Sequence, residues 1–248
     1  MDITNSTIFI AGGTTGIGRG LARRFAAAGA TVIVGGRHPA QAGDGLASVE
    51  IDVTDPASVR AARDQVLASH PGLDAVVTMA GVMVLEDLRD PGHFAQAETT
   101  VETNLLGTIR VIDAFTPHLL ERGAGTIVTV SSGIGFLPFP PMPTYAASKA
   151  GVHAYSEALR AQLAGTGVEV AELVPPAVAT TAEHKRTNPR ALDLEPFLDE
   201  VMTLLGQEPT PAEILVEGVR THRWAERDGT YAELVAQRSR ALSSLPGR

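Results

Sequence analysis

The chain of 248 residues is long enough for one large domain and for a sizeable buried core. Hydrophobic residues make up 44% and charged residues 19%, which indicates a globular protein and not a disordered one. Twenty basic and 28 acidic residues give a net charge of −8, so the charge offers no support for a nucleic-acid partner. Cysteine is absent, which excludes disulfides and thiolate ligands, and the seven histidines form no ligand pattern, so we expect no metal.

Two further absences in the sequence bear on location. No basic segment precedes a long apolar run near the N-terminus, and no apolar run approaches the ~18 residues that suggest a membrane span. We therefore expect a cytoplasmic protein without a membrane partner.

Short apolar, β-branched runs alternate along the chain with longer segments of helical periodicity. The nearly continuous hydrophobicity of the short runs is typical of strands covered on both faces of a parallel sheet. The alternation predicts an α/β protein with a Rossmann fold, a doubly wound parallel sheet of six to seven strands with helices on both faces. The expected strands are 7–12, 31–36, 47–53, 73–81, 125–132 and 168–174, and the expected helices are 16–29, 56–70, 94–123 and 145–165.

The rest of the chain carries weaker signals. The link 37–48 is short for a crossover helix, and the segment 181–210 has the character of a helical insertion near a site. Residues 211–229 have a helical pattern, and 230–235 is a candidate last strand. No linker divides the chain, so we expect residues 1–248 to form a single domain.

A glycine-rich turn, AGGTTGIGRG, joins the first expected strand to the first expected helix. Gly12, Gly16 and Gly18 allow backbone N–H groups to approach a pyrophosphate, which the positive end of the helix also attracts. Glycine turns are common, but this position between a strand and a helix indicates dinucleotide binding.

The end of the second strand bears on the choice between the two nicotinamide cofactors. Arg37 stands where NAD enzymes of this fold place an acidic residue, and an arginine can pair with the 2′-phosphate of NADP. This favours NADP(H) as the cofactor, with NAD(H) as the alternative. Arg37 could also be a solvated arginine at a strand end without any role in cofactor binding. Asp52 is a candidate acceptor for an adenine amino group or a helix cap, although Thr54 or Asp55 suits a cap better.

Tyr145 and Lys149 are four residues apart and share one face of the expected helix near its N-terminus. A tyrosine pKa is ordinarily about 10, and a nearby ammonium favours the phenolate, so this pair could move a proton to or from an alcohol oxygen. Ser132 lies thirteen residues before Tyr145, at the end of the fifth strand, where ligands bind in such sheets. The pair by itself is weak evidence, because most such pairs are helix surface.

Together these motifs identify a resemblance to the short-chain dehydrogenase/reductase family over residues 5–180. Gly12, Gly16 and Gly18 match the family's cofactor turn, and Ser132, Tyr145 and Lys149 match its catalytic triad with the same spacing. Asn104 matches its catalytic asparagine and Asp52 its adenine contact. The cofactor-binding residues that the resemblance implies are Gly12, Thr14, Thr15, Gly16, Ile17, Gly18, Arg37, His38, Asp52, Val53, Ala80, Gly81, Tyr145, Lys149, Pro175, Val178 and Thr180.

The resemblance implies hydride transfer between a nicotinamide and a carbonyl or secondary alcohol carbon. In reduction, Tyr145 would be the general acid and Ser132 would polarise the carbonyl. Lys149 would bind the nicotinamide ribose and lower the tyrosine pKa, and Asn104 would hold a water that returns the proton through Lys149.

The sequence departs from the family pattern at three motifs. Ala11 replaces a threonine before the first glycine, and Thr78-Met79 replaces two asparagines after the fourth strand, which puts a bracing network in doubt. Pro176 replaces a glycine after the sixth strand, so that loop should be stiffer. The sequence PPAV at 175–178 resembles the corresponding sequence in a sub-branch of bacterial oxidoreductases grouped with the DltE-type proteins.

Apolar residues near the expected site have two interpretations. The loop 133–143 and the segment 181–206 would line an apolar substrate pocket, or would bury the interface of a homodimer or homotetramer. His184 is a candidate neighbour of the substrate, and His153 a packed or surface histidine. The substrate residues expected are Ser132, Gly133, Phe136, Phe139, Met142 and Tyr145, with Phe197, Leu198 and Met202 as further wall residues.

The sequence therefore predicts an NADP(H)-dependent oxidoreductase acting on a small, apolar carbonyl or alcohol. An NAD-dependent alcohol dehydrogenase of the same family and a catalytically silent dinucleotide sensor are the alternatives. A nucleotide-sugar epimerase also uses this Tyr-Lys spacing, but usually needs a larger C-terminal domain than the ~70 residues available here.

Overall fold

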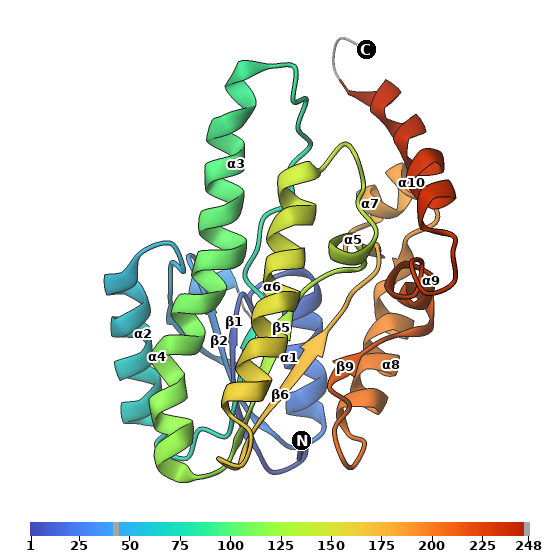
Figure 1. Ribbon diagram of the computed structural model, residues 1–248. Coiled ribbons are helices and arrows are strands. Elements are labelled where there is room, and N and C mark those ends of the chain that lie inside the picture. Colours follow the sequence, from blue (N-terminus) through green and yellow to red (C-terminus); the bar gives the residue numbers. More distant parts are fainter. Residues whose placement is uncertain (42–44, 246–248) are drawn as a thin grey trace.

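A computed structural model describes residues 1–41 and 45–245, and its middle layer is one parallel sheet (Figure 1). Its first strand lies between the second and the fourth, so Ala11 has Gly35 on one side and Thr78 on the other. The doubly wound Rossmann sheet predicted from the sequence is confirmed. From one edge to the other the strands are β3 (Ala47–Glu50), β2 (Thr31–Gly36), β1 (Thr7–Ala11), β4 (Ala75–Thr78), β5 (Gly125–Val130), β6 (Val168–Leu173) and β9 (Glu213–Ile214).

Helices cover both faces of the sheet, and the strand residues alternate between two cores. Ile8 and Ile10 of β1 face one core, while Phe9 and Ala11 face the other, as the two-residue period of a strand requires. Phe9 meets Phe115 there, with ring centroids 5.0 Å apart. The first core is covered by α1 (Gly16–Ala27) and α8 (Leu194–Leu205), and the second by α2 (Pro56–Ser69), α4 (Gly107–Arg122) and α6 (Pro143–Gln162).

The helix predicted over 94–123 is one continuous helical run with a wider turn inside it. It consists of α3 (Phe94–Val101), a π-helical turn at Glu102–Leu106 and α4. Gly123 ends α4 with a positive φ of 64°, which is the usual role of glycine at this position. The π turn contains Asn104, and such turns inside α-helices are often found at functional sites.

The C-terminal part differs from the sequence predictions. The helix predicted over 211–229 is wrong at its start, because β9 adds to the sheet edge there and Ile214 and Val216 are fully buried at alternate positions. The strand predicted over 230–235 is also wrong, since α10 (Tyr231–Ser239) occupies it and none of its described residues is buried. The short run of β-branched and aromatic residues there was too brief to distinguish a strand from a half-exposed helix.

The remaining elements are short. Helices form in the segment 181–210, where the sequence predicted a helical insertion. Residues 42–44 of the short link lie outside the described residues. No helix in the described parts of the chain is long and apolar enough to cross a membrane. The short elements are η1 (Pro39–Gln41), η2 (Pro91–His93), α5 (Gly133–Phe136), β7 (Val178–Ala179), α7 (Ala182–Thr187), β8 (Leu192–Asp193), η4 (Glu217–Val219), α9 (Arg220–Arg223) and η5 (Arg240–Ser244).

Candidate active site

A cavity of about 1120 Å³ opens at the carboxyl ends of β1, β4, β5 and β6. The strand order reverses between β1 and β4, so the helices that follow these strands lie on opposite faces of the sheet. This reversal leaves a crevice outside the strand ends, where ligands bind in open α/β sheets. The residues after each of the four strands line the cavity.

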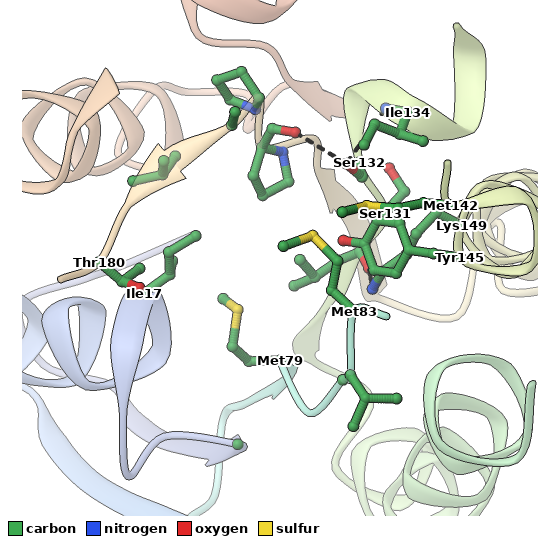
Figure 2. A pocket seen from close by; sticks show the side chains of 18 of the residues that line it. Ile17, Met79, Met83, Ser131, Ser132, Ile134, Met142, Tyr145, Lys149 and Thr180 are labelled. Atoms are coloured by element: carbon green, nitrogen blue, oxygen red, sulfur yellow. Dashed lines mark hydrogen bonds between the residues drawn. The ribbon is translucent and has the colours of Figure 1, made fainter. Parts of the chain in front are cut away.

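Ser132, Tyr145 and Lys149 come together on one wall of this cavity (Figure 2). Ser132 is the second residue after β5, and the other two side chains lie one turn apart near the start of α6. The Lys149 Nζ lies 5.9 Å from the centre of the Tyr145 ring and donates a hydrogen bond to the Val130 carbonyl at 2.8 Å. The three residues that the sequence grouped therefore share one surface, with Ile17 and Thr180 across the cavity from them.

Burial controls the protonation of this group. It raises the pKa of the Tyr145 phenol, and the hydrogen bond with Ser132 only partly opposes this rise. The pKa of Tyr145 therefore shifts upward overall, opposite to the lowering that the sequence analysis expected from Lys149, because removing the phenolate from water disfavours it. Burial also lowers the pKa of Lys149 to about 8, while the charge of Glu172 acts in the opposite direction. Near neutral pH, Tyr145 thus carries a proton that it can donate.

Asn104 is fully buried behind this wall and holds two elements together. Its Oδ1 accepts a hydrogen bond from the Val82 N–H at 2.8 Å, and its Nδ2 donates to the Val82 carbonyl at 2.9 Å. Nδ2 also lies 3.2 Å from the Ser148 hydroxyl of α6. The side chain thus joins the segment after β4 to α6, beside Lys149, and does not itself line the cavity.

Glu86 is a buried carboxylate that the sequence analysis did not single out. Its two oxygens accept hydrogen bonds from the Thr144 N–H at 3.1 Å and the Thr144 hydroxyl at 2.8 Å. Its own N–H donates to the Pro141 carbonyl at 2.9 Å. Because α6 has no capping side chain of its own at Met142, Glu86 supplies the acceptor that fixes the start of the helix next to Tyr145. The distance of 58 residues between Glu86 and Thr144 hides this role in the sequence.

The glycine turn packs its own backbone segments closely together. Gly12 has a positive φ of 91°, and a Cβ placed on Gly18 would lie 2.2 Å from the Gly12 carbonyl oxygen. A side chain at Gly18 would therefore clash with the backbone of Gly12, so the turn needs glycine at this position.

Two residues of opposite charge, Asp52 and Arg37, lie at the end of the cavity where the sequence predicts the adenine. Asp52 Oδ1 accepts hydrogen bonds from the N–H and hydroxyl of Thr54 at 2.9 and 2.7 Å, and these lower the pKa of its carboxyl. The nearby positive charge of Arg37, an exposed residue, acts in the same direction. Asp55, and not Asp52, caps α2 through the Ala57 N–H.

The structure brings most of the sequence-predicted cofactor residues to the cavity. Gly16 and His38 do not line it; a Cβ placed on Gly16 would lie 3.6 Å from the Thr180 side chain. The residues that do line it, besides Tyr145 and Lys149, are Gly12, Thr14, Thr15, Ile17, Gly18, Arg37, Asp52, Val53, Ala80, Gly81, Pro175, Val178 and Thr180.

The loop 133–143 forms an apolar wall, but not with all the residues predicted for it. Phe139 and Met142 line the cavity together with Leu137. Phe136 and Gly133 do not, because Phe136 turns away to stack against His153 and Arg223, with His153 at 4.5 Å between ring centroids.

The wall residues predicted in α8 are corrected by the structure. Phe197 and Leu198 are fully buried in the core beneath the sheet, and Met202 packs against that core. The apolar face of α8 is used against α1 and the sheet, so it is not available to a substrate. Met79 and Met83, which the sequence analysis did not assign to the pocket, line the cavity instead, as does His184.

A parallel, doubly wound sheet with a glycine turn and a Ser-Tyr-Lys group at its carboxyl edge is the arrangement of a Rossmann-fold oxidoreductase. The chain belongs to the short chain dehydrogenase family, whose model matches residues 6–191.

Known proteins similar to the chain agree with this family. It is 32% identical over 251 residues to the uncharacterized oxidoreductase DltE of Bacillus subtilis, covering 96% of this chain and 99% of that protein. A short chain dehydrogenase from Burkholderia cenocepacia in complex with NADP superposes with a TM-score of 0.82 at 24% identity, covering 95% of this chain and 99% of that one. A 3-ketoacyl-(acyl-carrier-protein) reductase from Brucella melitensis complexed with NADH has a TM-score of 0.73 at 24% identity, covering 88% and 96%.

Proposed function

We propose that the protein is an NADP(H)-dependent oxidoreductase that transfers a hydride between nicotinamide and a carbonyl or secondary alcohol carbon. Tyr145 acts as the general acid in reduction and as the general base in oxidation. The observation that carries this proposal is that Tyr145 lies with Ser132 and Lys149 on one wall of the cavity.

The nucleotide cofactor fits the cavity at its glycine turn. Gly12 and Gly18 would hold the pyrophosphate, Asp52 and Val53 would contact the adenine, and Lys149 would hold the nicotinamide ribose. When bound, the reduced nicotinamide supplies the hydride.

The side chains of the chain supply position and the proton. Ser132 and Tyr145 would both hydrogen-bond the substrate oxygen, and Tyr145 would give its proton to that oxygen as negative charge develops there. Burial raises the pKa of the phenol, so its proton is available to the substrate oxygen near neutral pH. Lys149, with a pKa of about 8, would stay charged near neutral pH and stabilise the phenolate that remains.

Arg37 supports NADP(H) over NAD(H). It lines the cavity next to Asp52 at the adenine end, where a guanidinium can bind a 2′-phosphate. Solved relatives of similar fold have been seen with either cofactor, so the test must compare both. We expect the wild type to prefer NADPH and Arg37→Asp to lose that preference; equal use of both cofactors by the wild type would contradict the assignment.

A panel of aldehydes, ketones and secondary alcohols, assayed with NADPH and NADH side by side, tests the activity. We expect turnover by the wild type and none by Tyr145→Phe, with NADPH binding retained by the variant. Tight cofactor binding without turnover of any panel member by the wild type would favour the dinucleotide sensor instead.

We further propose that residues 1–248 form a single domain and that the enzyme is a cytoplasmic homodimer or homotetramer. Leu106 and Leu120 support the assembly, because both are large apolar side chains about 40% exposed on the outer surface around α4.

A further inference from the structure

The cavity has a second end, which is built by the C-terminal part of the chain. Residues from α7 to β8, from α9 and from α10 line it, and Arg238 of α10 contacts Leu137 of loop 133–143. Its described lining contains two arginines, Arg190 and Arg238, and no carboxylate, since the lining aspartate, Asp52, lies at the adenine end. The polar and charged residues at this end are His184, Asn188, Arg190, Thr221, His222, Gln237 and Arg238.

Arg238 is half-buried, and its hydrogen-bond partners are uncharged. One terminal nitrogen donates to the Leu137 carbonyl at 2.6 Å, and the other lies against Nε2 of His222. Within residues 1–41 and 45–245, no carboxylate is within 4.0 Å of the guanidinium. Other half-buried arginines of the chain, Arg24, Arg110, Arg160 and Arg223, each form an ion pair with an aspartate or glutamate.

His222 orients Arg238 and leaves its charge uncompensated. Burial, helped by the positive charge of Arg238, lowers the pKa of His222 to about 4, so this imidazole is neutral near pH 7. Its Nε2 therefore accepts a hydrogen bond from the guanidinium. Burial also lowers the pKa of Arg238, because a charge removed from water without a counter-ion is disfavoured. A bound anion would supply the missing counter-ion.

The location of Arg238 connects this end with the reaction. Leu137 lies five residues after Ser132 and lines the same cavity as Tyr145. Phe139 and Met142 form apolar wall beside it. A ligand that spans this region would present a reactive carbon to Ser132 and Tyr145 and a planar or tetrahedral oxyanion to the guanidinium, which binds such groups through two parallel N–H donors.

We propose that the physiological substrate is an anionic carbonyl compound or alcohol, and that Arg238 binds its carboxylate, sulfonate or phosphate group. This inference rests on the proposed function and replaces the apolar substrate that the sequence suggested. The apolar wall then contacts the middle of the substrate, between the reacting carbon and the anionic group.

Two pairs of aldehydes that differ only in charge test the proposal. These are 4-carboxybenzaldehyde with methyl 4-formylbenzoate, and succinic semialdehyde with methyl 4-oxobutanoate. In the wild-type enzyme with NADPH, we expect kcat/KM for the acid to exceed that for its ester at least tenfold in one pair or both. Arg238→Gln should lower kcat/KM for the acid about 10- to 100-fold and leave kcat/KM for the ester within about threefold of the wild-type value.

Two further variants separate the charge from other effects. Arg238→Lys should retain part of the preference for the acid, because it restores the positive charge. Arg240→Gln is the matched control, since Arg240 is an exposed arginine of the next turn that does not line the cavity. This variant should change kcat/KM for neither the acid nor the ester. Titration of terephthalate into the NADP⁺-loaded enzyme gives a readout without turnover: we expect binding to the wild type and at least tenfold weaker binding to Arg238→Gln.

The outcomes distinguish this inference from the proposed function. If the aldehydes are reduced without preference for the acids, or if Arg238→Gln lowers acid and ester equally, Arg238 only braces loop 133–143 and the inference is overturned while the enzyme assignment stands. If neither the acids nor the esters are reduced and terephthalate does not bind, both the proposed function and the anionic-substrate inference fail.

Discussion

Replacing Gly18 with alanine tests whether the glycine turn is the nucleotide cradle that the structure indicates. The added Cβ would lie 2.2 Å from the Gly12 carbonyl oxygen and 3.0 Å from the Gly12 carbonyl carbon. An ordinary carbon–oxygen contact is about 3.3 Å or longer, so the two backbone segments must separate by about 1 Å. Gly12 is itself packed against the backbone of Ala80 after β4, which limits how the turn can relax.

We expect this separation to cost about 1–3 kcal/mol, the usual range for an added group that a packed site cannot accommodate. If the strain falls on the cofactor-binding conformation, NADPH should bind about 5- to 150-fold more weakly. Calorimetric titration of NADPH measures the affinity, and thermal unfolding measures how much of the cost falls on the fold.

Gly72→Ala is the matched control. Gly72 is exposed in the loop before β4, and a Cβ there would meet no atom within 4 Å, so affinity and melting temperature should stay near those of the wild type. The reasoning is refuted if Gly18→Ala binds NADPH as tightly as the control and unfolds at the same temperature.

Three further predictions concern α6 and the outer surface. Glu86→Gln should lower the melting temperature by a few degrees and should also lower kcat, because one Thr144 donor loses its acceptor. The control Glu98→Gln, on the exposed surface of α3, should change neither quantity. The hydrogen bond with Glu172 raises the pKa of His153, so its stabilisation is complete below the ordinary histidine pKa and is lost as pH rises through the raised value. Urea unfolding from pH 6 to 9 should show this loss in the wild type and not in His153→Gln; equal slopes would contradict it. Leu106→Glu with Leu120→Glu should reduce the mass measured by light scattering, and a wild-type monomer would refute the proposed assembly.

The sequence was sufficient to predict the sheet and the central residues of the candidate site. Short β-branched runs such as 125–132 favour a buried strand, and the four-residue spacing of Tyr145 and Lys149 places both on one face of a helix. Both relations join residues that are close in the sequence, and the geometry of a single strand or helix determines them.

Relations between distant segments could not be predicted in this way. Glu86 meets Thr144 across 58 residues, and Arg238 meets Leu137 across 101, so neither contact has a sequence signature. For Phe197 and Leu198, hydrophobicity indicated burial but not whether a ligand or α1 covers them. The pKa of Tyr145 depends on how completely it is buried, which the Tyr-Lys spacing does not reveal.

Transfer of deuterium from the reduced nicotinamide is the most direct test of the central claim, that this cavity supports hydride transfer assisted by Tyr145. The enzyme would be mixed with NADPH deuterated at both C4 positions and an aldehyde that it turns over, and the alcohol product analysed by mass spectrometry after a single turnover. The wild type should form alcohol carrying one deuterium on the former carbonyl carbon, and Tyr145→Phe should form less than about one hundredth as much while binding NADPH normally. Equal product from the variant, or wild-type product without deuterium, would contradict the account.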